Sequence, residues 1–510
     1  MPVLLSVDLG TEGARVGVFD LEGNCLADAH EAFPTAFPRP GWAEQDPHDW
    51  WRATVLATRA VLADSRVPDT SVLGIAVATT ASTVVVLDSA GDPLRPALLW
   101  MDSRASVEAE ETGTLSGRHP VLAYSGGADA VEWLVPKAMW LARHEAASYR
   151  EAAHVAEAVD YLTWRLTGAW VGSRMNATCK WNYDPLTGQF PLELYADLGV
   201  ADLAEKLPTD IRPVGEPAGT LSPGAAQELG IRGAPVVATG GIDAHVSLLG
   251  CGPQTSGLVS VVAGTSTVFV TEVADAVHSP AIWGPYPHAL RDEQWLIEGG
   301  QVSSGAVLNW LTRDVLGTSR ADLGALTAAA GEVAPGSHGL LVLDYFMGNR
   351  TPHRDARLRG SILGLTLGTT PAELYRAAVE GVCFGSRSVL ESWVQAGIPL
   401  DRIVLSGGIR HNPLWLAATA DVLGRPVEFV ASANLTLRSG AVQAAYAADL
   451  YPDLASAGEA FAPLTRRVDP DPRHVGVYDE GYQRYVDATV GLRPHLHALT
   501  ASTVAQRDDR

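Results

Sequence analysis

The sequence predicts an α/β protein built from two similar lobes that face each other across a cleft. Stretches typical of buried strands alternate with helix-like stretches along most of the 510 residues, which is the pattern of α/β folds. A strand, a glycine-threonine turn and a second strand occupy residues 4–19, and the same succession returns over residues 259–271. A repeat at so long a period is explained most simply by a duplicated domain.

The composition is that of a globular protein with ample apolar material for large cores. Hydrophobic residues make up 47% of the chain and charged residues 19%. The four cysteines lie far apart, which predicts reduced thiols and no thiolate metal site. A formal net charge of −21 repels polyanions, so nucleic acid and acidic membrane are excluded as main partners. Without a signal peptide or an apolar run of membrane-spanning length, a cytoplasmic protein is expected.

The amino-terminal residues predict a hairpin whose turn presents a carboxylate. Residues 3–20 read as strand, turn and strand, with the turn at Asp8-Leu-Gly-Thr11. Gly10 lets the backbone approach a phosphate, Thr11 offers a hydroxyl and Asp8 can hold a hydrated magnesium ion. A plain hairpin explains this turn by itself, but its second copy at residues 264–266 favours a phosphate site between two lobes.

The chain then continues the alternation of helices and strands. Residues 50–63 read as a helix and residues 72–77 and 83–87 as strands, and the stretch from residue 208 to residue 235 is rich in proline and glycine. We therefore expect an amino-terminal lobe over residues 1–245 and a carboxyl-terminal lobe over residues 246–490. The polar end of the chain predicts a frayed tail over residues 491–510.

The stretch Gly240-Gly241-Ile242-Asp243-Ala244-His245 lies where the two lobes meet. A buried-strand run ends in it and an apolar helix start follows. Such a strand end places the Asp243 carboxylate at the carboxyl edge of a sheet, where open α/β folds bind ligands. Position alone favours Asp243 as a helix cap, whereas the two glycine-threonine turns favour a functional carboxylate. His245 has apolar neighbours and is interpreted as a buried, hydrogen-bonded histidine, not a proton relay.

A third glycine turn follows the strand at residues 402–405 and opens the helix at residues 413–423. Gly407 and Gly408 allow close approach of a flat or charged ligand at a helix start, and Asn412 is placed to cap that helix. A tight turn that binds nothing explains the same residues. Because no Gly-Lys-Ser/Thr element is present, a P-loop nucleotide site is excluded.

These features resemble the FGGY carbohydrate kinases, members of the actin, heat-shock chaperone and sugar kinase superfamily. Residues 360–380 fit the carboxyl-lobe signature of that family throughout, and residues 136–141 keep part of its amino-lobe signature. The resemblance covers residues 3–490 in the right order. It implies two ribonuclease H-like lobes around a central cleft, ATP and Mg²⁺ as cofactors, and phosphoryl transfer to a carbohydrate.

Within the family the chain looks most like kinases of pentuloses and pentitols, in particular those related to D-ribulokinase and L-ribulokinase. The stretches that carry this likeness are residues 99–104, 126–141, 178–183, 283–286, 298–301 and 348–350. One stretch departs: Thr80-Ala-Ser-Thr-Val84 stands where D-ribulokinases have Thr-Cys-Ser-Leu-Val. That stretch lines the sugar pocket in the family, so the departure bears on sugar identity.

The resemblance also implies roles for single residues. Asp243 would be the catalytic base that accepts the proton of the attacking sugar hydroxyl, and Asp8 would hold Mg²⁺ through water. ATP would be bound by Gly10, Thr11, Arg15, Gly264, Thr265, Gly305, Asn309, Gly407, Gly408 and Asn412. The sugar would contact Ala81, Trp100, Glu132, Lys180, Asp243 and Glu298. Lys180 and Glu298 can instead form an internal ion pair, and Trp100 can belong to the core.

The sequence therefore predicts ATP-dependent phosphorylation of the terminal hydroxyl of a ketopentose, with D-ribulose favoured. Ribitol, L-ribulose, xylulose and a tetritol are the alternatives, because epimers differ by one hydroxyl and hence by one hydrogen bond in the pocket. A sugar-independent, nucleotide-gated regulator of the same fold is a further alternative. It has no reason to gather Lys180, Asp243 and Glu298. The sequence leaves a homodimer open.

Overall fold

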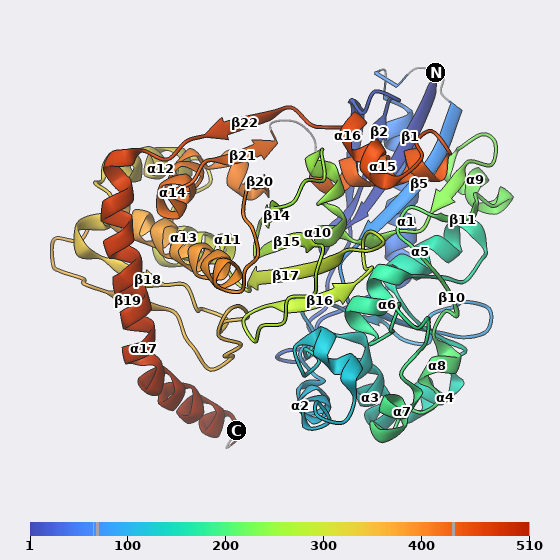
Figure 1. Cartoon of the computed structure of the whole chain (residues 1–510), viewed down its shortest axis with the longest axis horizontal. Helices are drawn as coiled ribbons and strands as arrows, with labels where there is room; N and C mark the ends of the chain where they lie inside the picture. Colours follow the sequence, from blue (N-terminus) through green and yellow to red (C-terminus); the bar gives the residue numbers. More distant parts are fainter. Residues whose placement is uncertain (65, 68–70, 431–433, 509–510) are drawn as a thin grey trace.

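The computed structural model describes residues 1–64, 66–67, 71–430 and 434–508, and shows two lobes, each built on a seven-stranded sheet (Figure 1). The first sheet has the order β11-β12-β5-β1-β2-β3, with β13 beside β5. Its strands are β1 (Pro2–Leu9), β2 (Gly13–Phe19), β3 (Cys25–Ala32), β5 (Ser71–Thr79), β11 (Pro217–Thr220), β12 (Val236–Ala238) and β13 (Gly241–Ile242).

The second sheet has the order β16-β17-β15-β14-β20-β21-β22. Its strands are β14 (Leu258–Ala263), β15 (Thr267–Val273), β16 (Trp283–Pro287), β17 (Trp295–Gln301), β20 (Arg402–Gly407), β21 (Val427–Val430) and β22 (Thr465–Val468). A two-stranded sheet of β18 (Leu341–Leu343) and β19 (Ser361–Leu363) lies in the same half of the chain.

The two sheets share one arrangement of strands, which confirms the duplication. β1 pairs antiparallel with β2 and parallel with β5. In the second sheet β14 pairs antiparallel with β15 and parallel with β20. The two glycine-threonine turns join the antiparallel strands in each case, so both turns lie at equivalent edges of the two sheets.

Helices cover both faces of the first sheet because β1 is apolar on both sides. Val3, Leu5 and Val7 share a core with Trp50 of α1 (Pro47–Leu62). Leu4, on the opposite face, shares a core with α15 (Leu435–Ala447). α5 (Ala158–Thr167), α9 (Pro223–Leu229), α10 (Asp243–Val246) and α16 (Leu454–Ala460) complete this lobe.

A smaller unit is inserted in the first lobe around the sheet β4-β7-β6-β8. Its strands are β4 (Glu44–Gln45), β6 (Val84–Leu87), β7 (Ala97–Leu98) and β8 (His154–Glu157), with β9 (Val171–Ser173) and β10 (Asp210–Arg212) paired nearby. Its helices are α2 (Ser106–Thr114), α3 (Leu134–His144), α4 (Ala146–Glu151), α6 (Arg174–Lys180), α7 (Leu192–Asp197) and α8 (Leu203–Lys206), with a 3-10 turn at Pro120–Ser125.

The second lobe is covered by α11 (Gly305–Asn309), α12 (Leu323–Glu332), α13 (Pro371–Gln395), α14 (Pro413–Leu423) and α17 (Pro472–Asp508). The long helix α13 begins at a capping box, in which Thr370 and Glu373 bond each other's backbone N–H groups. None of the helices in the described part of the chain is long and apolar enough to cross a membrane.

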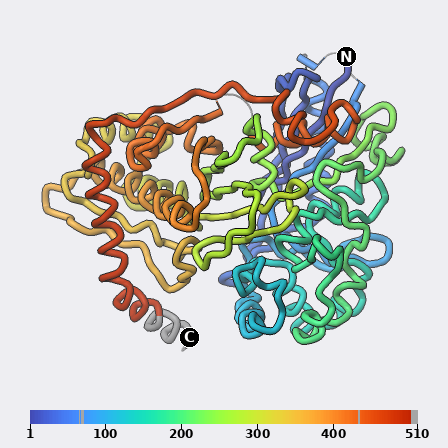
Figure 2. Tube along the Cα trace, viewed as in Figure 1, coloured from blue at the N-terminus to red at the C-terminus, as the bar shows by residue number. Residues whose placement is uncertain are grey.

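Two features of the chain's second half differ from the sequence-based expectation. The chain returns to the first lobe at α15, so a boundary at residue 245 separates the two sheets but not all of their helices (Figure 2). The expected frayed tail is wrong for residues 491–500, which continue α17; Leu496 is 6% exposed and His497 Nε2 lies 2.7 Å from Asp355 Oδ2. Residues 509–510 lie outside the described residues. Contacts with the second lobe, invisible in the local sequence, hold this helix in place.

Candidate active site

The carboxyl edge of the first sheet brings three chain segments together. β1 and β13 both run parallel to β5, and Asp8 and Gly241 are both in register with Ala78 of β5. Residues that leave these three strands therefore emerge side by side. These are the Asp8 to Thr11 turn, the loop that starts at Thr80, and Asp243, which begins α10. The structure thus places Asp243 at a sheet edge, as the sequence predicts.

Gly240 explains how β13 comes so close to β5. A β-carbon added at this residue would lie 2.0 Å from the carbonyl oxygen of Val77 in β5. Any other residue would push β13 away from the sheet. The glycine before Asp243 is thus part of the device that holds its carboxylate at the edge.

Three adjoining cavities lie around this edge. Their volumes are about 230, 850 and 1000 Å³, and we refer to them as the small, middle and large cavities. Asp243 lines both the small and the middle cavity. Gly264 and Thr265 line both the small and the large cavity, and Gly408 lines both the middle and the large one. Because they share lining residues, the three cavities adjoin one another and form a single site.

The small cavity contains every residue predicted to contact a sugar: Ala81, Trp100, Glu132, Lys180, Asp243 and Glu298. Thr11, Gly264 and Thr265, predicted to contact phosphate, lie in the same wall. The indole Nε1 of Trp100 donates a hydrogen bond of 3.0 Å to Thr11 Oγ1. Trp100 thus lines the cavity and also orients the Thr11 hydroxyl, and it is not fully buried in the core.

Glu298 is the electrostatic centre of the small cavity. Its side chain in β17 is buried, and its Oε2 lies 3.2 Å from both Lys180 Nζ and His245 Nε2, while Oε1 lies 3.2 Å from Arg350 Nη2. Burial would raise the pKa of Glu298, but the charges of Lys180 and Arg350 hold it well below the usual range. The internal ion pair considered from the sequence exists, and it faces the cavity as well.

His245 is buried, as the sequence predicts, and pairs with Glu298. Burial lowers its pKa, so the ring is neutral at physiological pH. The sequence did not predict that His245 lines the small cavity, because its apolar neighbours Val246 and Leu248 belong to the core.

Two carboxylates, Asp8 and Asp243, face the middle cavity together with Gly10, Arg15 and Gly407. Burial raises the pKa of Asp8 to about 6, against the opposing effects of Arg15 and Asn434. The side-chain amide of Asn434 donates a hydrogen bond of 2.9 Å to Asp8 Oδ2, and Arg15 Nη1 lies 3.7 Å from the same oxygen. Two oxygen donors that lack full charge compensation in one cavity fit a hydrated divalent cation.

The pKa of Asp243 is raised further than the pKa of Asp8. Its pKa is raised to about 7 by burial and by the negative charge of Asp8, and the Ala244 N–H, 2.6 Å from Oδ1, opposes the shift. A carboxylate with a pKa near neutrality is matched to proton transfer at cellular pH. The geometry therefore places a carboxylate with a pKa near neutrality between the small cavity and the wall that contains Asp8.

The large cavity contains the remaining residues predicted for ATP: Gly305, Asn309, Gly408 and Asn412. Gly407 has a φ of 85°, and a β-carbon there would lie 2.5 Å from the Ala263 carbonyl oxygen, so this turn requires glycine. Asn412 caps α14 through a 3.1 Å bond from Trp415 N, as its sequence position also suggested. Its amide donates to Tyr375 Oη at 2.9 Å, so one residue caps the helix and shapes the cavity.

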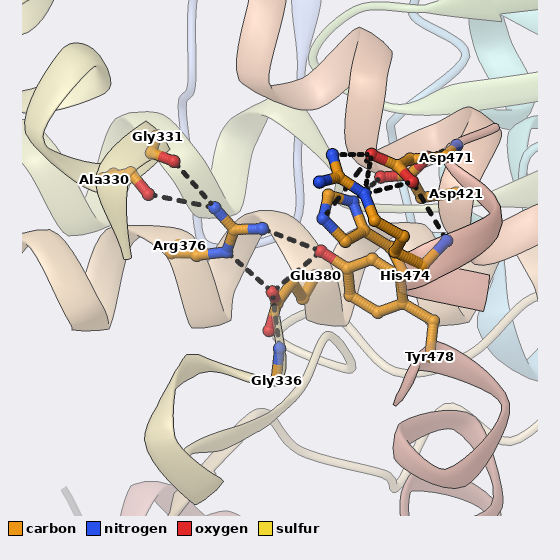
Figure 3. A network of polar contacts seen from close by, with 10 residues as sticks. Ala330, Gly331, Gly336, Arg376, Glu380, Asp421, Asp471, His474 and Tyr478 are labelled. Carbon is orange, nitrogen blue, oxygen red and sulfur yellow. Dashed lines mark hydrogen bonds and ion pairs between the residues drawn. The ribbon is translucent and has the colours of Figure 1, made fainter. Parts of the chain in front are cut away.

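Arg376, Asp421 and His474 line the large cavity and belong to a network of polar contacts (Figure 3). Arg376 of α13 donates 2.9 Å to Glu380 Oε1 and also bonds the Ala330 and Gly331 carbonyl groups at the end of α12. His474 of α17 lies 2.8 Å from Asp421 of α14. The network ties α17 to the helices that line the cavity, which explains why the carboxyl-terminal helix is ordered.

Two lining residues were missed as ligand candidates from the sequence: Arg350 lines the small cavity and Asn434 lines the middle one. Thr80 and Ser82, which belong to the stretch expected to line the sugar pocket, also line the small cavity. Arg350 lies in one of the stretches that carry the family likeness, which is the signal that could have found it. Asn434 and Asp8 are far apart in the sequence, and no local pattern indicates that they are in contact.

Both halves of the chain match one protein family. Residues 3–250 match the N-terminal domain of the FGGY family of carbohydrate kinases, and residues 259–448 match the C-terminal domain of the same family. The chain belongs to the FGGY family of carbohydrate kinases. It is therefore a sugar kinase, a phosphotransferase that acts on a small-molecule carbohydrate, with the two-lobed fold expected from the sequence.

Named relatives of this FGGY kinase cover most of its length. It is 31% identical to a ribulokinase of Mycolicibacterium smegmatis, over 95% of this chain and 93% of the relative. It is 29% identical to a xylulose kinase of Escherichia coli, over 86% and 89% of the two chains. The crystal structure of a xylulose kinase from Rhodospirillum rubrum superposes with a TM-score of 0.82 at 28% identity, covering 97% of this chain and all of that one.

Proposed function

We propose that this FGGY kinase transfers the terminal phosphoryl group of ATP to the terminal hydroxyl of a ketopentose, with D-ribulose favoured. The observation that carries the proposal is the small cavity, in which Asp243 lies between a charged polar pocket and the two glycine-threonine turns. With a volume of about 230 Å³ the cavity lies below the range of about 300–1,000 Å³ typical of drug-sized ligands, which suits a small polyol.

Asp243 is assigned as the base. Phosphoryl transfer asks a protein mainly for positioning and for stabilisation of charge, and a carboxylate beside the attacking hydroxyl supplies both an orienting acceptor and a proton acceptor. Its raised pKa keeps the proton affinity high enough for this purpose. Deprotonation of the hydroxyl and transfer of its proton to Asp243 leave the sugar oxygen free to attack the phosphorus.

The phosphate groups are assigned to the two turns. The backbone N–H groups and hydroxyls around Gly10, Thr11, Gly264 and Thr265 bind phosphate oxygens without bulk positive charge. Asp8 would hold Mg²⁺ through water, and the ion would neutralise the phosphate charge when bound. Gly305, Asn309, Gly408 and Asn412 would hold the nucleoside in the large cavity.

The polar groups of the small cavity support a sugar as acceptor. Lys180 and Arg350 donate, Glu132 and Glu298 accept, and Trp100 offers a flat apolar wall, so a ring of hydroxyls finds partners on each side. A nucleotide-gated regulator without a sugar would gain nothing from burying these charges. The relatives named ribulokinase and xylulose kinase support the pentulose class. Ribitol, L-ribulose, xylulose and a tetritol remain the competing acceptors, and the homodimer and cytoplasmic location stay predictions.

The test compares ADP release over ketopentoses, pentitols, tetritols and glycerol at fixed Mg²⁺ and ATP. We expect one ketopentose to exceed the others by at least about tenfold in kcat/KM. Asp243→Asn should lower kcat for that sugar by at least about 100-fold and leave ATP affinity within about threefold. Asp275→Asn, at an exposed position, is the matched control. Near-normal turnover of Asp243→Asn would refute the assignment of Asp243 as the base. If none of these sugars or polyols stimulates ADP release, the proposal that a ketopentose is the phosphoryl acceptor is refuted.

A further inference from the structure

The loop that follows β5 contains a residue in an unfavourable backbone conformation. Ser82 has a φ of 55°, in the left-handed region that non-glycine residues rarely adopt. The residue is 1% exposed and lies in the wall of the small cavity, directly after Ala81. Such a conformation persists only where the surroundings impose it.

Both peptide groups of Ser82 are held by buried charged side chains. Its N–H donates 2.7 Å to Glu157 Oε2, and its carbonyl oxygen accepts a 2.7 Å bond from Lys137 Nζ. Glu157 and Lys137 are each 0% exposed. A carboxylate on the donor side and an ammonium on the acceptor side are the charges that fix this peptide unit most strongly.

Lys137 also reaches a second wall of the cavity. Its Nζ donates 2.6 Å to the carbonyl oxygen of Leu99, the residue before Trp100. Burial lowers the pKa of Lys137 to about 7, although Asp102 and Glu132 favour its charged form. The side chain thus joins the loop at Ala81 to the segment that carries Trp100.

Glu157 reaches a third wall. Its Oε2 accepts a hydrogen bond of 2.7 Å from Asn176 Nδ2. Its Oε1 accepts a hydrogen bond of 2.8 Å from the indole Nε1 of Trp181, the residue after Lys180. Asn176 lies in α6, which ends at Lys180. Glu157 thus joins the loop at Ser82 to the helix that carries the cavity lysine.

We propose that Lys137 and Glu157 form a clamp that positions three walls of the sugar cavity, at Ala81, Trp100 and Lys180, and thereby sets the affinity for the sugar. The inference rests on the proposed function of the small cavity. Neither Lys137 nor Glu157 is among the described residues that line the small cavity, so both are positioning residues. Asp243, Asp8 and the turn at Gly264 lie on other elements, so the clamp bears on sugar binding more than on phosphoryl transfer.

The glycine variant of Ser82 separates this clamp from a general structural role. Glycine adopts a positive φ without strain, so a chain with glycine at residue 82 has less need of the clamp. Lys137→Met keeps the length of the side chain and removes its charge and donors. Glu157→Gln leaves one acceptor for donors that now use two oxygens. Glu272→Gln, which removes a buried carboxylate of the second lobe that pairs with Arg291, is the matched control for loss of a buried carboxylate.

The experiment measures KM for the best sugar, kcat, KM for ATP and the melting temperature of each variant. We expect Lys137→Met and Glu157→Gln to raise the sugar KM by about tenfold or more, with kcat and KM for ATP within about threefold. Adding Ser82→Gly to Lys137→Met should return the sugar KM to within about threefold of the wild type. Glu272→Gln should leave the sugar KM unchanged. An unchanged sugar KM in both clamp variants, or a rise that Ser82→Gly does not reduce, overturns the proposal.

Hydrogen exchange of the backbone amides keeps this test separate from the test of the proposed function. If the wild type phosphorylates no sugar, the proposed function fails, and the clamp is then judged by exchange alone. Faster exchange of residues 79–84, 99–104 and 178–183 in Lys137→Met or Glu157→Gln, but not in Glu272→Gln, supports the clamp. If the variant that folds, Lys137→Met or Glu157→Gln, exchanges these segments at wild-type rates, the clamp proposal is overturned.

Discussion

Ionisation of Asp243 should limit catalysis on the acidic side of neutrality. The base must be deprotonated to accept a proton, and burial with the negative charge of Asp8 raises the pKa of Asp243 to about 7. A carboxyl group with a raised pKa is protonated below that value. We therefore expect kcat/KM to rise as the pH rises through about 7 and to reach a plateau above it.

The magnitude follows from the ionised fraction. For a single proton, kcat/KM falls about tenfold per pH unit below the pKa, so at pH 5 it should be about 100-fold below the plateau. An aspartate with the ordinary pKa of 3.8 would leave the rate nearly constant from pH 5 upward. Because Asp8 also has a raised pKa, of about 6, the acidic limb reports the pair. Asp8→Asn removes the repelling charge, so the limb should move to lower pH.

The assay is kcat/KM for MgATP at saturating sugar and low free Mg²⁺, from pH 5 to 8.5, by direct measurement of ADP. Under these conditions the titrating enzyme form carries no nucleotide-bound cation, which would stabilise both carboxylates and lower their pKa values. Asp275→Asn should keep the wild-type limb. A rate independent of pH between 5 and 8, or an acidic limb that stays in place in Asp8→Asn, would refute the reasoning.

Two further predictions concern stability. Glu298→Gln removes the carboxylate that three cationic or polar groups share, and should cost about 3–5 kcal/mol in the free energy of unfolding, measured by urea denaturation; a change below about 1 kcal/mol would show that these groups find other partners. Deletion of residues 491–510 removes buried Leu496 and the contact of His497 with Asp355, and should lower the melting temperature. An unchanged melting temperature would mean that this end of α17 contributes nothing.

Local patterns in the sequence predicted much of the site. The alternation of apolar residues and the glycine turns indicated strands that end near Asp8 and Asp243, and both of these strands run parallel to β5, which brings their ends to one edge. The family likeness then predicted cavity residues such as Lys180 and Glu298, which do line one cavity. Their roles in binding and catalysis stay predictions until the experiments above are done.

Long-range contacts had no such signal. Asn434 bonds Asp8 across nearly the whole chain, and the contacts of Ser82 with Lys137 and Glu157 join separate elements. The left-handed conformation of Ser82 was likewise invisible, because serine shows no preference for it. The frayed tail was wrong for the same reason: polar residues at the end of a chain say nothing of the Asp355 side chain that meets them.

The sequence by itself determined the α/β class, the duplication and the places where the residues proposed for catalysis and phosphate binding leave their strands. These features depend on the period of apolar residues and on glycine, which act over a few neighbouring residues. Only the tertiary structure decided that Lys180, His245 and Arg350 converge on Glu298, and that α15 returns to the first sheet. Those outcomes depend on how elements far apart in the chain pack together, because the energy of a buried charge is set by whatever surrounds it in space.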